Sequence, residues 1–477
     1  MIRSAHLAYL QRLFTVVLGT IGVFAPWAES QHTAAPAVAK PAPITFTELT
    51  SKLHLSLPPT TASSGAVTLP VTIRSQDYSL EYARRTLVPA MGGSIAVGDF
   101  DGDGHPDLYV VVPGGSNHLF QNRADGTFVD VTDKARVPGT GSDLSATFGD
   151  FDKSGHPSLF VAGLGGVTLY HSNGDGTFTD TTAKAGLRGK PGELATSVLL
   201  FDADNDGFLD VLITIYTDFS VPPAKGSFKF PNDFAGTNSR LYRNQHDGTF
   251  TEVTEAAGLT ANPGRTHKAV AADFNNGRMD LLLLRDDKPP ALFRNQGQGI
   301  FEDQTWEAGR EIWKYAYVDA QTGDFNHDGK TDVVLWSTIG NEVLINQGSG
   351  KFKQEESLPL VYAANRAFGF HGMAADINGN GYDDLLTVDD RGNWHFIVNR
   401  AGHFEEAACA WILEKSTADG SESKAPPLPA FASLAAARLG DSSKLNLIGL
   451  TTDGRIEVFE WKRIPYHRAV SEPRRTK

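Results

Sequence analysis

One segment recurs seven times along the chain, and its spacing restricts the fold to a repeat architecture. The segment joins two apolar runs through an acidic loop that contains glycine, as in AVGDFDGDGHPDLYVV from Ala96. The first loop positions of the copies are separated by 51, 52, 71, 51, 52 and 62 residues, and they are Asp99, Asp150, Asp202, Asp273, Asp324, Asp376 and Arg438. A period of this length is typical of solenoids and propellers, in which each repeat is one structural unit.

A second segment follows each of the first six copies and predicts another pair of strands. Its clearest form is LYHSNGDGTFTDTT from Leu169, in which Asp-Gly separates two alternating runs. This pattern indicates a hairpin, because the tight turn needs positive φ. Each unit is therefore predicted to hold four antiparallel strands, which is the composition of a propeller blade.

The last copy lacks its outer strand, and the N-terminal part of the chain offers a replacement. FTELTSKLHL from Phe46 is similar to FTDTTAKAGL from Phe178, which follows the hairpin of the second unit. We expect the strand near Phe46 to join the last blade, since a closed ring leaves no open sheet edge. The predicted fold is all-β, a seven-bladed β-propeller of four-stranded antiparallel blades over residues 44–464. A stack without closure is the alternative.

The two ends of the chain are predicted to lie outside the propeller. Arg3 and Arg12 precede the apolar run LFTVVLGTIGVFA, which starts at Leu13, and a small-residue exit follows at Ala28, so residues 1–28 are predicted to be a signal peptide. A membrane anchor is the alternative, although the run is shorter than the roughly 20 residues that span a bilayer. An Ala/Pro-rich linker (29–43) and a basic tail (465–477) complete the chain. We expect an exported protein that is periplasmic, on the cell surface or secreted, with no integral membrane segment after cleavage.

Charge and cysteine content narrow the partners and the sources of stability. The formal net charge is −13, and it becomes −15 without residues 1–28, which carry two arginines and no acid. An acidic surface argues against nucleic acid as a partner. The single cysteine, Cys409, excludes an internal disulfide, so the core, together with any bound metal, must hold the fold.

The acidic loop of the first copy has the composition of a calcium site. Asp99, Asp101 and Asp103 alternate, and Asp107 returns to the same point, while the carbonyl of His105 can complete the set. Ca²⁺ takes six to eight oxygen ligands, whereas softer metals prefer Cys or His. The loop is not an EF-hand, because the twelfth residue is Val110 instead of Glu.

Four loops share this pattern, so we predict about four structural Ca²⁺ sites. Their candidate ligands are Asp99, Asp101, Asp103, His105 and Asp107; Asp202, Asp204, Asp206, Phe208 and Asp210; Asp324, Asn326, Asp328, Lys330 and Asp332; and Asp376, Asn378, Asn380, Tyr382 and Asp384. His105, Phe208, Lys330 and Tyr382 would contribute main-chain carbonyls. The loop at Asp150 lacks the closing carboxylate, the loop at Asp273 is one residue short, and the copy at Arg438 has lost the pattern. The alternative is a turn that caps itself with side-chain hydrogen bonds.

These loops and hairpins resemble the FG-GAP/VCBS repeat family, whose best-known members are the propeller heads of integrin α subunits and whose bacterial relatives are exported. The resemblance extends over Thr45 to Trp461 and is specific in six of the seven units. It implies a seven-bladed propeller with calcium loops on one face. Carried over by position, the ligands are those of the first, third, fifth and sixth loops.

A partner surface is predicted on the opposite face, where the 71-residue step contains an insertion that starts at Tyr216. Aromatic and arginine side chains on loops are typical of binding surfaces. The candidates are Tyr216, Phe219, Phe228, Phe230, Phe234, Arg265, His267, Lys268, Trp313, Tyr315, Arg366 and His371. The alternative is that the aromatic residues pack the insertion onto the propeller rim.

The expected function is that of a non-catalytic binding or adhesion module, a monomer that recognises a protein or a polysaccharide. The alternative is a calcium-dependent extracellular enzyme, a polysaccharide lyase or a phosphodiesterase, on the same propeller. A lyase would need a base and a cationic group, for which Arg265, His267, Lys268 and His371 are the candidates. The sequence contains no GxSxG, HExxH or Walker motif.

Overall fold

The computed structural model describes residues 45–57, 71–112, 114–224, 226–274, 276–306, 308, 317–337, 340–348, 350–355, 358, 372–388, 394–406, 412–414, 431–439, 446–451 and 454–462. Several predictions fall outside the described residues. They are the signal peptide, the linker, the tail, Cys409 and the candidate partner residues Trp313, Tyr315, Arg366 and His371.

Seven antiparallel sheets follow one another along the chain, and we number them as blades 1–7. Blade 1 contains β3 (Ser94–Gly98), β4 (Asp107–Val111), β5 (His118–Asn122) and β6 (Phe128–Asp130). Blade 2 contains β7 (Asp143–Gly149), β8 (Ser158–Gly163), β9 (Gly166–Ser172) and β10 (Phe178–Asp180). Blade 3 contains β11 (Glu193–Phe201), β12 (Asp210–Asp218), β14 (Arg240–Asn244) and β15 (Phe250–Glu252). Blade 4 contains β16 (Thr266–Ala272), β17 (Asp280–Arg285), β18 (Ala291–Gly297) and β19 (Ile300–Asp303).

The other three blades repeat this order. Blade 5 contains β20 (Tyr317–Gly323), β21 (Asp332–Ser337), β22 (Gly340–Gly348) and β23 (Lys351–Gln354). Blade 6 contains β24 (Gly372–Ala375), β25 (Asp384–Val388), β26 (Trp394–Arg400) and β27 (His403–Glu406). Blade 7 contains β29 (Phe431–Ala437), β30 (Asn446–Thr451), β31 (Ile456–Lys462) and β1 (Thr45–Glu48), and β28 (Ile412–Glu414) adds a fifth strand parallel to β1.

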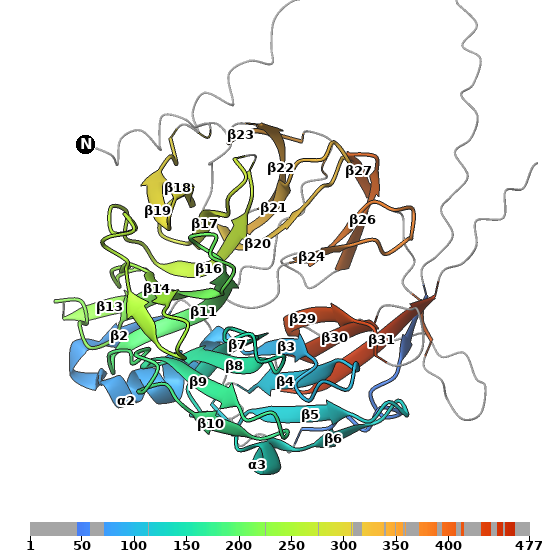
Figure 1. The fold of residues 1–477 in the computed structure, drawn as a ribbon, viewed down its shortest axis with the longest axis horizontal. Helices are drawn as coiled ribbons and strands as arrows, with labels where there is room; N and C mark the ends of the chain where they lie inside the picture. The colour runs from blue at the N-terminus through green and yellow to red at the C-terminus, as the bar shows by residue number, and fades with distance from the viewer. Residues whose placement is uncertain are drawn as a thin grey trace, which may run out of the picture. The chain divides into compact units, whose positions relative to one another are not determined.

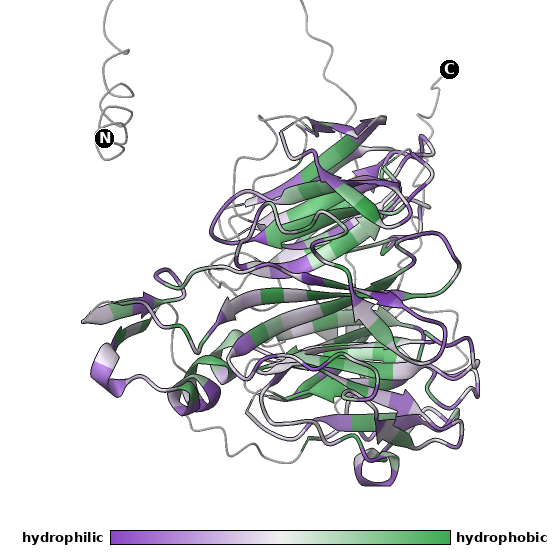
Figure 2. Cartoon of the chain, turned by 60° about the vertical axis from the view of Figure 1, so that its left-hand side comes forward, coloured by the Kyte–Doolittle hydropathy of each residue, from purple (hydrophilic) through white to green (hydrophobic). Residues whose placement is uncertain are grey.

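A hydrophobic core lies between each pair of neighbouring blades and arranges the sheets in a ring (Figure 1). The second strand of a blade is apolar on both faces because a neighbouring blade covers each face; every residue of β4 and β8 is buried. Figure 2 shows this pattern as hydrophobic strands that end in hydrophilic loops. The sequence prediction of an all-β, seven-bladed propeller is confirmed.

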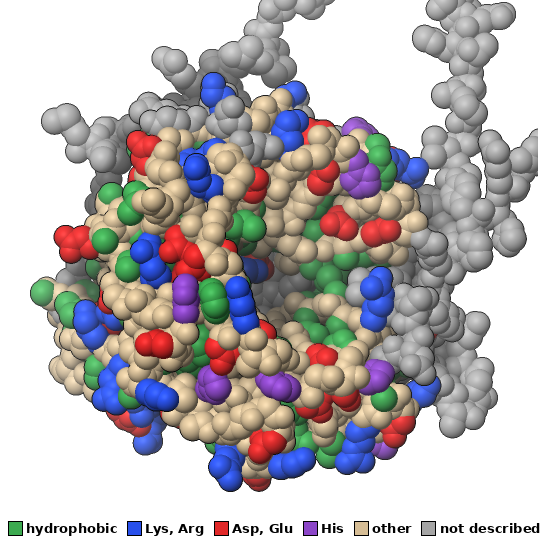
Figure 3. All heavy atoms as spheres, in the orientation of Figure 1, with side chains coloured by type: hydrophobic (Ala, Val, Ile, Leu, Met, Phe, Trp, Pro, Cys, Tyr) green, Lys and Arg blue, Asp and Glu red, His purple; other side chains and the backbone are tan. Residues whose placement is uncertain are grey.

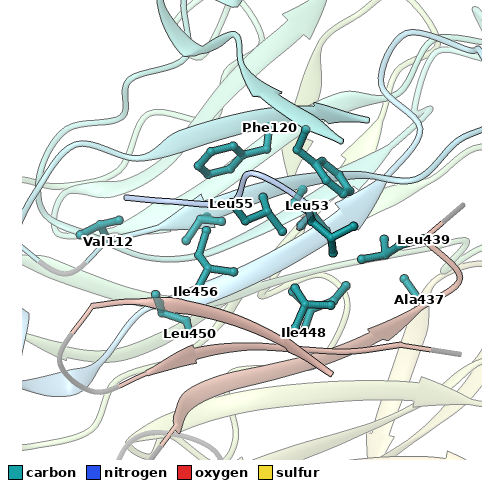
Figure 4. Packing of buried hydrophobic residues seen from close by; sticks show 13 residues of the cluster. Leu53, Leu55, Val112, Phe120, Ala437, Leu439, Ile448, Leu450 and Ile456 are labelled. Carbon is teal, nitrogen blue, oxygen red and sulfur yellow. The ribbon is translucent and has the colours of Figure 1, made fainter. Parts of the chain in front are cut away.

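The first and last parts of the described chain meet in blade 7. β1 pairs antiparallel with β31, with Phe46 opposite Trp461. Past β1, Leu53 and Leu55 insert between blade 7 and blade 1, where they pack with residues that include Phe120 and Ile448 (Figure 4). The backbone N–H of Phe128 in β6 donates to the carbonyl of Leu53 at 2.9 Å. The N-terminal segment therefore stabilises the contact between the last blade and the first.

An accessory element accompanies the propeller. It contains β2 (Val71–Arg74), β13 (Ser227–Phe230) and four helical turns, which are η1 (Ser75–Asp77), α2 (Leu80–Tyr82), η2 (Ala83–Leu87) and η3 (Pro89–Met91). A further helix, α3 (Thr132–Ala135), follows β6. The sequence analysis did not predict the helical turns before β3. In the part of the chain that the structure describes, no helix has both the length and the apolar character needed to cross a membrane.

The aromatic residues of the insertion form the core of this accessory element. Five side chains predicted to bind a partner are at most 2% exposed, and they are Tyr216, Phe219, Phe228, Phe230 and Phe234. They pack against residues of the helical turns such as Leu87 and Val88. Their assignment as partner-binding residues is therefore wrong, and the alternative of packing is correct. The same cluster contains Leu144 of β7 and Leu194 of β11, so the two-stranded sheet β2–β13, which is too small to be stable alone, packs against blades 2 and 3.

Candidate metal centres

The acidic loop of blade 1 connects β3 to β4 and is organised by its first residue. The Oδ1 atom of Asp99 accepts hydrogen bonds from the backbone N–H groups of Gly102 and Asp103 at 2.7 and 3.1 Å, and Oδ2 accepts from Gly104 at 2.8 Å. Gly102 and Gly104 have φ values of 77° and 85°, which other residues rarely adopt. These turns bring the acidic side chains back toward the start of β4.

The ninth loop position is a buried carboxylate that joins the loop to the third strand. In blade 1 the N–H groups of Phe100 and Asn122 donate to the two oxygens of Asp107 at 3.0 and 2.8 Å. In blade 3 the N–H groups of Ala203 and Asn244 donate to Asp210 at 2.9 and 2.8 Å. This carboxylate is therefore part of the blade itself.

Burial and neighbouring acids make these ninth carboxyl groups unusually easy to protonate. Desolvation raises the pKa of Asp107 to about 7, and backbone hydrogen bonds lower it less than burial raises it. Desolvation likewise raises the pKa to about 6 for Asp210, about 6 for Asp332 and about 7 for Asp384. A cation bound close to these carboxyl groups would favour their charged form.

Three carboxylates converge in each of two loops. In blade 1, one oxygen from each of Asp99, Asp101 and Asp107 lies within 4.8 Å of the others; we call these residues group 1. In blade 3, Asp202, Asp204 and Asp210 form the second such group among the described residues, which we call group 3. Both groups supply only hard oxygen ligands, which Ca²⁺ prefers. The fold thus brings together the first, third and ninth positions of the predicted sites.

The surroundings of the Asp204 carboxylate in group 3 indicate whether a cation fits there. The Oδ2 atom of Asp204 lies 3.1 Å from Nε of Arg243, whereas Oδ1 is buried and has no hydrogen-bond partner in the described structure. A buried carboxylate oxygen without a donor is costly, and a metal ion would satisfy it. The residues of group 3 therefore fit a divalent cation.

The fifth positions lie differently from the sequence prediction of four converging carboxylates. Asp103 Oδ1 accepts from the N–H of His105 at 2.8 Å, and Asp206 Oδ1 accepts from that of Phe208 at 2.8 Å. The Oδ2 atom of Asp206 contacts Nε2 of His246 at 2.7 Å. Neither residue belongs to the two groups found among the described residues. Their role as ligands, and that of the carbonyls of His105 and Phe208, stays a prediction.

The loops of blades 5 and 6 do not bring three acids together within the described structure. In blade 5 the Lys330 ammonium contacts Asp328 at 2.7 Å, and Asp324 accepts from the N–H groups of Asp328 and Gly329. The amide of Asn326 accepts from the N–H of Asp328 at 3.0 Å, and the carboxylate of Asp332 binds the N–H groups of Phe325 and Asn346.

Blade 6 replaces acidic residues by amides that form hydrogen bonds of their own. Nδ2 of Asn378 donates to Asp384 at 2.8 Å, Nδ2 of Asn380 donates to the carbonyl of Asn399 at 2.8 Å, and Tyr382 stacks on His327 with ring centroids 3.9 Å apart. The Oδ1 atom of Asp376 is buried and has no hydrogen-bond partner in the described structure. Loops 1 and 3 cap themselves with the same kind of hydrogen bonds, so what distinguishes loops 5 and 6 is that their acids do not converge in threes among the described residues.

In blade 4 an arginine takes the place of a cation. The loop is one residue short, and Nε of Arg294 in β18 lies 3.2 Å from the Oδ2 atom of the buried Asp280. In blade 2, Ser158 occupies the ninth position, where its Oγ accepts from the N–H of Ser172 at 3.1 Å. Neither loop belongs to a group of three converging acids among the described residues, and their weak metal binding stays a prediction.

Sequence reasoning missed a set of asparagines that link the blades. Nδ2 of Asn244 donates to the carbonyl of Phe151 in blade 2, and Nδ2 of Asn295 donates to that of Ala203 in blade 3, each at 2.8 Å. Asn399 does the same to Phe325 in blade 5 at 2.8 Å. The Asn that recurs in the second repeat segment was the available signal.

The cationic cluster proposed for a partner or a lyase is buried. Arg265 and His267 are 7% and 8% exposed, and they lie 2.7 and 3.1 Å from the oxygens of Asp286. Although burial raises it, the pKa of Asp286 is lowered to about 2 by the contacts and charges of His267 and Arg265. Arg265 and His267 are thus internal partners of Asp286, and their assignment to an exposed site is wrong. Lys268 is half-buried, with its ammonium 2.6 Å from Asp319.

The comparison with family models agrees with the repeat architecture. The FG-GAP-like repeat model matches four segments of the chain, at residues 99–161, 150–213, 275–335 and 324–387. No curated protein matches significantly. One similar solved structure is described as the basis of specific recognition of non-reducing terminal N-acetylglucosamine by an Agrocybe aegerita lectin; it is 20% identical, covers 65% of this chain and 78% of its own, and has a TM-score of 0.44.

Two further similar structures are of BBS1N in complex with ARL6DN, soaked with mercury and with lead. They are 10% and 11% identical to this chain, with TM-scores of 0.45 and 0.46. Each match covers 79% of this chain and 95% of the other.

Proposed function

We propose that this β-propeller, four segments of which match the FG-GAP-like repeat model, is an exported, calcium-binding module that binds a protein or a polysaccharide without catalysing a reaction. The observation that carries the calcium part is the Oδ1 atom of Asp204, buried in a group of three carboxylates and without a donor. A cation there would satisfy this oxygen and reduce the repulsion among the three acids.

Asp99, Asp101 and Asp107 would hold one ion, and Asp202, Asp204 and Asp210 another. The chemistry supplied by the ion is charge neutralisation, which holds the loop against the start of β4 or β12. Extracellular calcium sites need only weak affinity, with dissociation constants of about 10⁻⁴–10⁻³ M. Export, which the segment 1–28 suggests, would place the protein where such weak sites fill.

The binding role follows from the fold and from where the charged groups lie. A propeller presents loops from every blade on two faces, and loops are where binding residues concentrate. Figure 3 shows acidic, basic and histidine side chains of the described residues interspersed on one face. The lyase alternative relied on Arg265, His267, Lys268 and His371. Burial beside Asp286 removes Arg265 and His267 from a surface cleft, Lys268 is half-buried, and His371 lies outside the described residues.

Calorimetric titration of the metal-free protein with Ca²⁺ tests this function directly. We expect two ions per chain, and we expect the Asp204→Asn variant to bind one. The control is Asp247→Asn, which changes an exposed hairpin acid outside group 3. A protein that binds no calcium, or an Asp204→Asn variant that still binds two ions, would contradict the proposed sites. A screen of glycans and envelope proteins in millimolar calcium then identifies the ligand.

A further inference from the structure

A cavity lies between the acidic loop of blade 1 and the β9–β10 turn of blade 2. Its volume is about 270 Å³, and Asp101, Asp103, Gln121 and Asp175 are among the residues that line it. Small-molecule pockets are usually roughly 300–1,000 Å³, so this cavity suits a single side chain better than a larger ligand. The acidic loops and the turns between third and fourth strands lie on the same face, because antiparallel strands alternate in direction.

The equivalent place between blades 3 and 4 is filled by Arg243. This residue precedes Asn244 in the third strand of its blade, as Gln121 precedes Asn122 in blade 1. Its Nε lies 3.1 Å from the Oδ2 atom of Asp204, and its Nη2 donates to the carbonyl of Gln298 at 2.8 Å. The guanidinium group therefore bridges the acidic loop of one blade and the hairpin turn of the next.

Blades 4 and 5 repeat this arrangement. Arg294 occupies the same strand position, and its Nε lies 3.2 Å from the Oδ2 atom of Asp280. A Cβ atom built on Gly350, in the hairpin turn of blade 5, would lie 2.0 Å from Nη1 of Arg294. Gly299 in the turn of blade 4 would meet Nη2 of Arg243 in the same way, at 2.7 Å. In two places on the ring, a guanidinium group thus packs between a loop and the turn of the next blade.

Blade 1 keeps the acceptors but lacks the guanidinium. Gln121 is shorter than arginine and uncharged, and its Nε2 donates to the Oδ2 atom of Asp101 at 2.5 Å. The turn residue at the position of Gln298 is Asp175, which adds another carboxylate. Three acids line the cavity against one lysine, the exposed Lys134, while Phe100 contributes an apolar surface. The cavity is complementary to a cation with several donors and an apolar stem.

We propose that the crevice between blades 1 and 2 binds the guanidinium group of an arginine side chain from a protein partner. The planar guanidinium has five N–H donors, which match carboxylate and carbonyl acceptors better than a lysine ammonium does. The methylene stem would pack on the apolar wall. This inference rests on the proposed role as a binding module and selects a protein over a polysaccharide as the partner. It also places the partner on the face of the acidic loops.

Titration with Nα-acetyl-arginine amide, in the presence of calcium, tests the proposal. The signals to follow by NMR are the backbone amides of Gly174 and Gly176, which line the cavity. We expect saturable shifts, with binding at least about tenfold tighter than that of Nα-acetyl-citrulline amide, which has a similar shape but no charge. Equal affinity for the two compounds, or no shift at either glycine, would overturn the proposal.

Two substitutions test whether an arginine of the chain and the arginine of a ligand occupy the same place. One fills the crevice between blades 1 and 2, and the other empties the crevice between blades 3 and 4. Gln121→Arg supplies the guanidinium from within the chain, and we expect it to abolish binding of arginine amide while the melting temperature stays the same or rises. Arg243→Gln should create a second site, with new shifts at Gly297 and Gly299. The control Gln245→Arg adds the same charge at an exposed turn position and should bind as the unmodified protein does. Should Gln121→Arg fail to fold, Asp175→Asn provides the test, and we expect it to weaken the binding of arginine amide by about tenfold.

The same titration in EGTA separates this proposal from the calcium sites. Selective arginine binding by a protein whose stability does not depend on calcium would refute the metal proposal and support the arginine site. Stabilisation by calcium without discrimination between arginine and citrulline would refute the arginine site alone.

Discussion

Blades 3 and 4 are neighbours with the same strand order, yet they compensate their buried acid in different ways. In both, the residue that closes the loop is a buried aspartate, the ninth loop residue Asp210 in blade 3 and the eighth, Asp280, in blade 4. Its oxygens accept backbone hydrogen bonds from the loop and the third strand. Blade 3 surrounds it with two further acids, whereas blade 4 lacks one loop residue and places Arg294 against it.

The difference shows which residues of the repeat hold the blade together and which are needed only for the proposed metal site. The ninth aspartate and the third-strand asparagine hold the blade whether or not a cation site is present. The first and third acids add charge that needs compensation. We therefore expect blade 3 to depend on calcium and blade 4 to be independent of it.

The largest effect is expected in blade 4, for Asp280→Ala. The substitution removes the acceptor of the Asn295 N–H and leaves the buried guanidinium of Arg294 without its partner. Breaking a buried pair in this way costs about 3–5 kcal/mol of unfolding free energy. Urea denaturation in calcium and in EGTA should give the same loss. A cost below about 1 kcal/mol would mean that blade 4 does not need this ion pair.

The second effect concerns blade 3. At calcium concentrations 100-fold above the dissociation constant, one site stabilises a folded protein by about 2.7 kcal/mol. We expect Asp204→Asn to remove one site's share of the calcium-dependent stability, measured as the difference between urea curves in calcium and in EGTA. Asp273→Asn, which removes the first acid of the blade 4 loop, should leave that difference unchanged. If both variants lose equal amounts, the contrast between the two loops is wrong.

Much of the fold could be predicted because each repeat carries its own strong local signals. The apolar runs, the glycines at positive φ and the Asp-Gly turns each specify one part of a blade, and repetition makes every part visible several times. The accessory core could not be predicted in this way. Phe228 and Phe230 read as exposed binding residues because their partners, the helical turns near Leu87, are more than a hundred residues away and carry no repeat signal.

The candidate sites were predictable in part for a similar reason. The spacing of the acids identified the first, third and ninth positions, which the backbone turn brings together in blades 1 and 3. It did not reveal Arg294 or Arg243, since these lie on the third strand, far from the loop in sequence. Arg265 and His267 read as an exposed cationic cluster because their partner, Asp286, is distant in sequence. The antiparallel pairing of β16 with β17 brings Asp286, which follows β17, next to the start of β16.

A smaller effect is expected for the asparagines that connect neighbouring blades. Nδ2 of Asn295 donates to the carbonyl of Ala203 in loop 3, and Nδ2 of Asn244 donates to that of Phe151 in loop 2, each at 2.8 Å. Replacing either by alanine leaves buried carbonyl groups without a donor and should cost about 1–3 kcal/mol in urea denaturation. The two losses should be similar, because this contact belongs to the scaffold. A loss confined to Asn295→Ala would instead tie the asparagine to the calcium loop that it touches.

The smallest effect is a pH dependence of calcium binding in blades 1 and 3. Burial raises the pKa of Asp107 to about 7 and that of Asp210 to about 6 in the metal-free protein. A raised pKa in the folded state means that the metal-free fold is favoured at low pH and loses stability as the pH rises from about 4 through these values.

Calcium binds the deprotonated carboxylates, so it competes with protons below pH 7. Above pH 7, bound calcium offsets the loss of stability of the metal-free fold. We expect the calcium midpoint at pH 5.5 to be roughly three- to tenfold higher than at pH 7.5, measured by calorimetry. Asp280→Asn in blade 4 should not alter this ratio, and a midpoint that is the same at both pH values would show that these two carboxyl groups are not ligands.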